Sequence, residues 1–504
     1  MKKFTGLVVI LAALVLGSYY GMGYLTEKKV KESLEVINQS NGLNVQVKEY
    51  HRGWFTSMAV LDWHLQIPEH AITSANGQPE TVPAEEYQLS MPVKVHHGPI
   101  IFAHRKVKFG FGYAHSELAL PEKVINQFKN TFKAESIQPK LDLSLFVNYL
   151  NNTSLELAIP AFNLLAKEGN GQFSWSGLTS DTNVSSNLDK IEGNLSVDGF
   201  SLAKDQVKTV MSSIHSEYNL RKNEMGLYLG DANLSFPSLI ITNNEQPIFE
   251  LNKFHVYSDT NIENGLFSSH FKTSIDKVIA NSKIYGPGNL EVEIRNLDAT
   301  VLAQINQQVN QIQQANETQK QQALLALLPE LPKLLSKGAE FEIKEMNFVM
   351  PQGKVEGNML ISLPKIESNN PFELIQKIQG NGKFAIPAVV LKEVLVESFR
   401  QKLITASQSQ PQTLEQGIMQ QMQKQTGQAN QPVANQPVST TAAAPNPIQV
   451  DQQAQVLADK QIASMLQSGI IIQNENDYIL EMKFSQGQLM INNKPFNSEM
   501  LKFQ

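Results

Sequence analysis

Residues 4–25 read FTGLVVILAALVLGSYYGMGYL, a run without a charged side chain. As a helix with a rise of 1.5 Å per residue the run would be about 33 Å long, and the hydrocarbon core of a bilayer is roughly 30 Å thick. Met1, Lys2 and Lys3 precede it, as basic residues precede the apolar part of a signal peptide. We therefore predict a transmembrane helix over residues 1–26, with the long polar body outside the cytoplasm.

The same run favours an uncleaved signal anchor over a cleaved signal peptide. Its best small-residue cleavage site, Gly21-Met22-Gly23, is poor. Three neighbouring tyrosines suit a membrane interface, where an aromatic ring keeps its hydroxyl in water: Tyr19, Tyr20 and Tyr24. Cleavage remains the alternative interpretation.

Composition excludes several classes of protein. The chain has 504 residues, a net charge of −6 and a pI near 6.0, so it lacks the basic balance of a nucleic-acid-binding protein. It has no cysteine, which excludes disulfides, thiol catalysis and cysteine metal sites. No second run is long and apolar enough to span a bilayer, so we expect a single-pass protein.

The hydrophobic period changes to two after a predicted helix over residues 26–41. Leu43, Val45 and Val47 alternate with polar residues, and residues 58–67 form a second predicted strand. The two strands and the glycine between them, Gly53, predict a hairpin.

The bend of this hairpin holds the most specific short motif of the chain: Tyr50, Arg52, Gly53, Trp54 and Phe55. In one interpretation the rings pack the core, Trp54 is buried and the glycine needs a positive φ. In the other the motif binds a partner or lipid headgroups, with the Arg52 guanidinium lying on an aromatic face. We prefer the packing interpretation, and the contact interpretation stays open.

The remaining pattern predicts an α+β fold, in which the transmembrane helix precedes a β-rich body of antiparallel meanders with several amphipathic helices. The predicted segments are the anchor at 1–26, an α+β domain at 27–168, a β-meander domain at 169–300, helices and strands at 301–404, a flexible Gln/Pro/Ala-rich insertion at 405–449, and a helix with strands at 450–504. Helices are expected at 121–132, from Asp298 to Ile312, and at 324–335, 388–404 and 451–467.

No catalytic, cofactor-binding or metal-binding set is visible in the sequence. The chain has no Gly-x-Ser-x-Gly elbow, no His-Glu-x-x-His pair and no phosphate loop. The adjacent His96 and His97 would point to opposite faces of a strand, which argues against a shared metal. We assign turn roles to two motifs: His97, Gly98 and Pro99, and Tyr285, Gly286 and Pro287.

Four stretches resemble the YdgA-like family of bacterial envelope proteins, whose function is undetermined. They are NGLNVQVKEYHRGWFTSMA at 41–59, KVHHGPIIF at 94–102, KIYGPGNLEVEIRNLDA at 283–299 and DYILEMKFSQGQLMINNKPF at 477–496. The resemblance implies an inner-membrane anchor and a periplasmic body, and it brings no catalytic residues. The beginning of the chain is also distantly similar to AsmA-like proteins, which are associated with lipid traffic.

These observations favour a non-enzymatic protein with a structural or protein-binding role in the cell envelope. The expected partners are the inner membrane, through the N-terminal helix, and an envelope protein or a lipid; nucleic acid is not expected. An alternative is the binding or transfer of a lipid or other hydrophobic ligand along a groove of the β-sheet. A second alternative is an envelope hydrolase.

Overall fold

The computed structural model describes twelve stretches of the chain: residues 15–28, 30–31, 43–67, 70–73, 79–82, 85–103, 106–118, 120, 122–312, 327–365, 371–409 and 447–497. They divide into two compact units. The larger unit comprises residues 1–341 and 363–374, and the smaller unit comprises residues 342–362 and 375–504.

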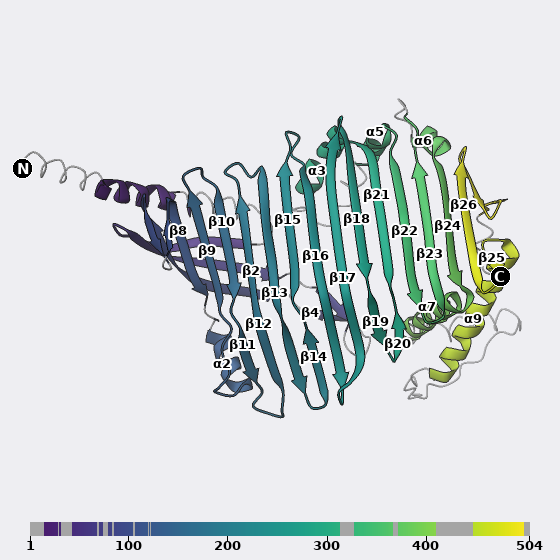
Figure 1. The fold of residues 1–504 in the computed structure, drawn as a ribbon, viewed down its shortest axis with the longest axis horizontal. Helices are drawn as coiled ribbons and strands as arrows, with labels where there is room; N and C mark the ends of the chain where they lie inside the picture. Colours follow the sequence, from purple (N-terminus) through teal and green to yellow (C-terminus); the bar gives the residue numbers. More distant parts are fainter. Residues whose placement is uncertain are drawn as a thin grey trace, which may run out of the picture. The chain divides into compact units, whose positions relative to one another are not determined.

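Strands of the larger unit pair almost entirely with the strands that follow them in the chain. They are β1 (Leu43–Arg52), β2 (Thr56–Ile67), β3 (His70–Thr73), β4 (Pro79–Val82), β5 (Glu85–His97), β6 (Ile101–Ala103), β7 (Lys106–Lys108), β8 (Gly110–Leu118), β9 (Leu141–Asn148), β10 (Thr153–Ile159), β11 (Phe162–Leu165), β12 (Gln172–Val184), β13 (Lys190–Lys204), β14 (Val207–Met211), β15 (Ile214–Lys222), β16 (Tyr228–Asn243), β17 (Gln246–Glu263), β18 (Leu266–Ile275), β19 (Lys277–Ala280), β20 (Lys283–Tyr285) and β21 (Gly288–Asp298). The long strands of the meander lie side by side in chain order (Figure 1).

The predicted meander is confirmed, and its turns follow from the sequence. Asn264 and Gly265 join β17 to β18 with φ values of 52° and 76°, as expected for an Asn-Gly hairpin turn. A long strand such as β13 pairs with β15 along one half and with β14 along the other. Gly199 lies between the two halves with φ of 102°, where an added Cβ would meet the Met211 carbonyl oxygen at 2.3 Å.

The predicted hairpin at the start of the body is also confirmed. β1 pairs antiparallel with β2, which pairs with β5, and the sheet continues through β8, β9 and β10. Alternate residues of β1, β2 and β5 meet on one face as a buried apolar cluster: Val45, Ala59, Leu61, Met91, Val93 and Val95. A helix over residues 15–28 and 30–31, called here the N-terminal helix, packs on this cluster through Val30.

Besides the N-terminal helix, the larger unit has these helices: α2 (Glu122–Thr131), α3 (Ala299–Ile312), the 3-10 turn η1 (Leu328–Glu330), α5 (Leu331–Leu335) and α6 (Pro371–Lys377), which continues into the smaller unit. The Asp298 carboxylate accepts hydrogen bonds from the backbone N–H groups of Thr300 and Val301, at 3.0 and 3.1 Å. This bond pattern is an N-cap, so the predicted start of α3 is confirmed.

The smaller unit combines strands with two long helices: β22 (Glu340–Met350), which begins in the larger unit, β23 (Gly353–Ser362), β24 (Gln379–Pro387), α7 (Ala388–Ser409), α9 (Pro447–Ser468), β25 (Ile472–Asn474), β26 (Asp477–Ser485), β27 (Gln488–Ile491) and β28 (Lys494–Pro495). β24 lies between β23 and β26, antiparallel to both. The core contains Ile462, Ile470 and Ile471, and the two helices are tied by Arg400, whose Nε lies 2.7 Å from Asp451.

The predicted fold class is wrong. The described residues are 58% strand and 23% helix, so the fold is mainly antiparallel β and not α+β. Helices were correctly located at 121–132, from Asp298 to Ile312, and at 388–404 and 451–467, but strands make up most of the described residues. The longest strand, β17, has 18 residues. None of the helices in the described part of the chain has the length and apolar composition needed to cross a bilayer.

Two predicted features lie largely outside the described residues. Residues 1–14 hold half of the uncharged run, and residues 410–446 hold most of the predicted insertion. At the borders of the insertion, α7 continues to Ser409 and α9 begins at Pro447.

Candidate functional site

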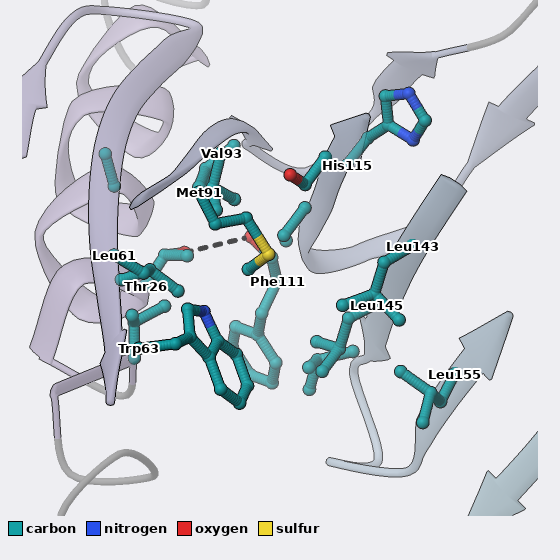
Figure 2. A pocket seen from close by; sticks show the side chains of 17 residues that line it. Thr26, Leu61, Trp63, Met91, Val93, Phe111, His115, Leu143, Leu145 and Leu155 are labelled. Carbon is teal, nitrogen blue, oxygen red and sulfur yellow. Dashed lines mark hydrogen bonds between the residues drawn. The ribbon is translucent and has the colours of Figure 1, made fainter. Parts of the chain in front are cut away.

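An apolar cavity of about 460 Å³ lies between the N-terminal helix and the sheet. Three strands each contribute three residues that share one face, and β8, β10 and the helix complete the lining. The strands give Ala59, Leu61 and Trp63 from β2, Met91, Val93 and Val95 from β5, and Leu143, Leu145 and Val147 from β9. Figure 2 shows Trp63 and Phe111 projecting into the middle of this space.

The polar groups of the lining are mostly engaged with the protein itself. The Thr26 hydroxyl lies 2.8 Å from the Met22 carbonyl and 3.3 Å from the Phe111 carbonyl, and the Ser116 hydroxyl donates to the Pro92 carbonyl at 2.7 Å. In contrast, the buried indole N–H of Trp63 has no hydrogen-bond partner among the described residues. The N–H is itself buried, so Trp63 lines the cavity with its ring and not with this donor.

The N-terminal helix is fixed to the sheet by His97, at the end of β5. His97 is 1% exposed; its Nδ1 lies 3.2 Å from the Tyr19 carbonyl oxygen and its Nε2 lies 3.1 Å from the Ser57 hydroxyl. Nδ1–H therefore donates to the carbonyl, and Nε2 of the neutral ring accepts from the hydroxyl. Burial lowers the pKa of His97, which keeps the ring in this neutral form.

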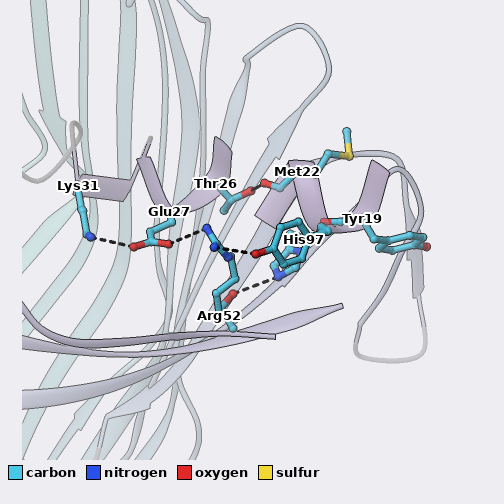
Figure 3. A network of polar contacts seen from close by, with 9 residues as sticks. Tyr19, Met22, Thr26, Glu27, Lys31, Arg52 and His97 are labelled. Atoms are coloured by element: carbon cyan, nitrogen blue, oxygen red, sulfur yellow. Dashed lines mark hydrogen bonds and ion pairs between the residues drawn. The ribbon is translucent and has the colours of Figure 1, made fainter. Parts of the chain in front are cut away.

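A second contact joins the helix to the bend motif through Arg52, as Figure 3 shows. The guanidinium lies 3.4 Å from the Glu27 carboxylate, donates to the Tyr20 hydroxyl at 3.2 Å, and sits 5.0 and 5.5 Å from the ring centroids of Tyr20 and Tyr24. Glu27 also pairs with Lys31 at 2.8 Å. The Arg52 guanidinium thus contacts a carboxylate and two tyrosine rings of the N-terminal helix. The sequence motif alone did not predict that Arg52 contacts this helix.

The expected burial of Trp54 is wrong. Trp54 is 57% and Phe55 is 51% exposed, and their rings contact the helix only at one edge, at 5.4 Å from Tyr20 and 4.9 Å from Tyr19. Tyr50 is half-buried and packs against the apolar cluster. Both rings lie at the hairpin tip between β1 and β2, where the described residues leave more than half of each side chain exposed.

Gly53 is required for a reason other than the predicted positive φ. Its backbone does not have a positive φ, but an added Cβ would lie 2.5 Å from the Thr56 carbonyl oxygen. The bend is closed by the Gly53 N–H, which donates to that same carbonyl at 3.0 Å. Glycine is therefore needed at position 53 because the Thr56 carbonyl oxygen lies too close for a side chain, and not because φ is positive.

The turn motif His97, Gly98 and Pro99 lies against the same helix. Gly98 has a φ of 127°, and an added Cβ would lie 2.0 Å from the Tyr19 ring. The Tyr19 hydroxyl donates to the Ile100 carbonyl at 2.7 Å. The structure thus brings the bend motif and this turn together on one helix, which the sequence did not predict.

The comparisons identify a family but no function. The sequence matches the description "Bacterial protein of unknown function (DUF945)" over residues 1–499. The chain belongs to this family. Membership fits the uncharacterised bacterial family that the sequence resemblance implied, but it supports neither the YdgA-like nor the AsmA-like name. The comparison with curated proteins gave no match.

The second turn motif of this DUF945 protein stands apart from the site. Tyr285 ends β20, and Gly286 and Pro287 lead into β21 through a cis peptide bond. In the order of the sheet, β21 is separated from β9 and the cavity by β10, β12, β13, β15, β16, β17 and β18. The motif therefore belongs to the meander and not to the cavity.

One group in the DUF945 protein has the composition of a metal site. Donor atoms of His270, Glu291 and Glu293 lie within 4.8 Å of one another on β18 and β21. Sequence analysis missed this group because its members meet only through strand pairing, with His270 opposite Glu293. The carboxylates already face cations: Lys272 lies 3.6 Å from Glu291, and Arg295 pairs with Glu293. This arrangement is a neutralised ion-pair network on the sheet face.

Proposed function

We propose that this DUF945 protein binds an apolar ligand of the acyl-chain class in the cavity between the N-terminal helix and the sheet. The observation that carries the proposal is the lining, in which same-face residues of β2, β5 and β9 are apolar at nine positions. A volume of about 460 Å³ lies in the usual range of ligand pockets, roughly 300 to 1,000 Å³.

Hydrophobic contacts along this lining favour a hydrocarbon chain, and Trp63 contributes its ring to them.

A place in the cell envelope, at the inner membrane with the body in the periplasm, belongs to the same proposal. It is supported by the uncharged run at residues 4–25 and by the resemblance to YdgA-like envelope proteins. The structural or protein-binding role expected from the sequence stays a prediction, because the cavity favours ligand binding more directly.

The proposal is tested by titrating a brominated fatty acid into detergent-free protein with one tryptophan retained. The chain has three, so W54F/W175F leaves Trp63 in the cavity and W54F/W63F leaves Trp175 in the meander. We expect saturable quenching of Trp63 and none of Trp175. Leu145→Asp, which puts a charge into the lining, should weaken binding at least tenfold, while Leu202→Asp at a similarly exposed site should not. Equal quenching of both tryptophans would exclude cavity binding.

A further inference from the structure

Exposed apolar side chains gather at one end of the strands that form the cavity. This strand-end patch consists of Trp54, Phe55, Ile100, Phe102, Phe109 and Leu150. Phe102 is 68% and Leu150 is 74% exposed, high values for large apolar side chains. Isolated exposed apolar residues are normal, but a contiguous group marks a contact surface.

Strand pairing places Trp54, Phe55, Phe109 and Leu150 at the same end, and Ile100 and Phe102 follow the turn after β5 into the separate β6–β7 hairpin. The tip holding Trp54 and Phe55 lies beside the end of β5, because Thr56 pairs with His96 and the His97 N–H donates to the Phe55 carbonyl at 3.1 Å. Phe109 immediately precedes β8, whose first residue pairs with the last residue of β9. Leu150 follows in the β9–β10 turn, and the neighbouring Tyr149 hydroxyl contacts the Pro99 carbonyl.

The described part of the N-terminal helix begins beside this patch. Tyr19 contacts Phe55 and Ile100, whereas Thr26, two turns later, contacts β8. At 1.5 Å per residue, Val15 lies about 6 Å beyond Tyr19, away from the sheet. Val15 and Leu16 are 50% and 43% exposed, and the helix projects past the strands in Figure 1.

The sequence before Val15 identifies the occupant of the patch. Fourteen residues precede it, and positions 4–14 carry no charge. An uncharged sequence of this kind favours hydrocarbon surroundings, and it directly precedes the helix that contacts Trp54. The tyrosines and tryptophan around the patch suit the boundary between hydrocarbon and water.

We propose that the strand-end patch contacts the surface of a lipid bilayer, with the Trp54 and Phe102 side chains among the acyl chains nearest the headgroups. This inference does not depend on ligand binding in the cavity. In this inference Trp54 and Phe55, the exposed residues of the bend motif, contact lipid, whereas Arg52 contacts the N-terminal helix.

The test measures contact at Trp54, because the uncharged run would attach the chain to vesicles by itself. Full-length W63F/W175F protein is mixed with vesicles of phosphatidylethanolamine and phosphatidylglycerol whose acyl chains are brominated close to the headgroup. We expect at least twofold quenching and a blue shift of Trp54. In the same protein, Phe102→Ser should halve the quenching, whereas Ile284→Ser, at a residue of similar exposure outside the patch, should leave it unchanged.

Three other outcomes overturn the inference, and a fourth separates it from cavity binding. Trp54 that stays unquenched on vesicle-bound protein shows that the patch does not meet lipid. Trp54 that is unquenched by lipid but shifts to the blue as protein concentration rises identifies a second copy of the chain as the occupant. Quenching of Trp63 by free fatty acid without quenching of Trp54 by vesicles supports the cavity and rejects the patch. Quenching of Trp54 by vesicles without quenching of Trp63 by free fatty acid supports lipid contact at the patch and rejects ligand binding in the cavity.

Discussion

Replacement of Gly23 by alanine tests how the N-terminal helix is attached. An ideal Cβ at this position would lie 2.6 Å from Cε1 of His97 and 3.0 Å from both ring nitrogens. The ring is 1% exposed and both nitrogens are hydrogen-bonded, so it cannot rotate away without losing a bond. Overpacking costs about 1 to 3 kcal/mol and a lost hydrogen bond about 0.5 to 1.5 kcal/mol.

The same substitution favours the helix by about 1 kcal/mol, because glycine is a poor helix former. The net expected loss is therefore about 0.5 to 3.5 kcal/mol of helix attachment. Gly21→Ala is the matched control, since an added Cβ there meets nothing within 4 Å. It should stabilise the helix by up to about 1 kcal/mol.

Hydrogen exchange of the backbone amides in residues 15–28, read by mass spectrometry, measures the attachment directly. Gly23→Ala should speed exchange and Gly21→Ala should slow it. His97→Ser should remove much of the Gly23→Ala effect, because the shorter side chain no longer occupies the space. If both alanine variants slow exchange equally, the helix does not rest on His97 and the reasoning is wrong.

Two further predictions concern a pH dependence and the smaller unit. Burial lowers the pKa of His97 in the folded protein, so the neutral ring stabilises the fold above pH about 6.5 and this stabilisation decreases as the pH falls below that value. We therefore expect the urea midpoint of unfolding to change less with pH in His97→Asn than in the wild type. Asn492 donates to the carbonyls of Gly469 and Ile470 at 3.0 Å and accepts from the Glu481 N–H at 2.8 Å. In thermal unfolding, Asn492→Ala should lower the free energy of unfolding by about 1 to 3 kcal/mol. Asn492→Asp keeps the shape but removes the two donated bonds, so it should also destabilise the protein.

Local pattern was sufficient to predict the strands, but not what covers them. Leu61, Trp63 and Leu65 alternate with polar residues, which correctly indicates a strand with one apolar face. The same alternation is found whether the face is packed tightly or borders a cavity. The difference depends on how closely the N-terminal helix approaches, and this distance is set by contacts such as Gly23 with His97, 74 positions apart in the chain.

Composition also misled the interpretation of the bend motif. Large rings beside a glycine are most often core residues, but Trp54 and Phe55 lie exposed at the hairpin tip between β1 and β2. No property of the six-residue motif distinguishes these cases. The informative signal was the uncharged run at residues 4–25, since a tip located beside such a segment has a reason to remain apolar and exposed.

The N-terminal helix links the cavity and the strand-end patch energetically. Tyr19 contacts the patch, and Thr26 and Val30 line the cavity, so one helix supplies part of both surfaces. A ligand that binds only when the helix is attached stabilises that attachment by about 2.7 kcal/mol at a concentration of 100 times its Kd. This gain is comparable to the loss expected for Gly23→Ala. Occupation of the cavity would therefore hold the helix in place, and with it the tyrosines that flank the patch at the proposed membrane surface.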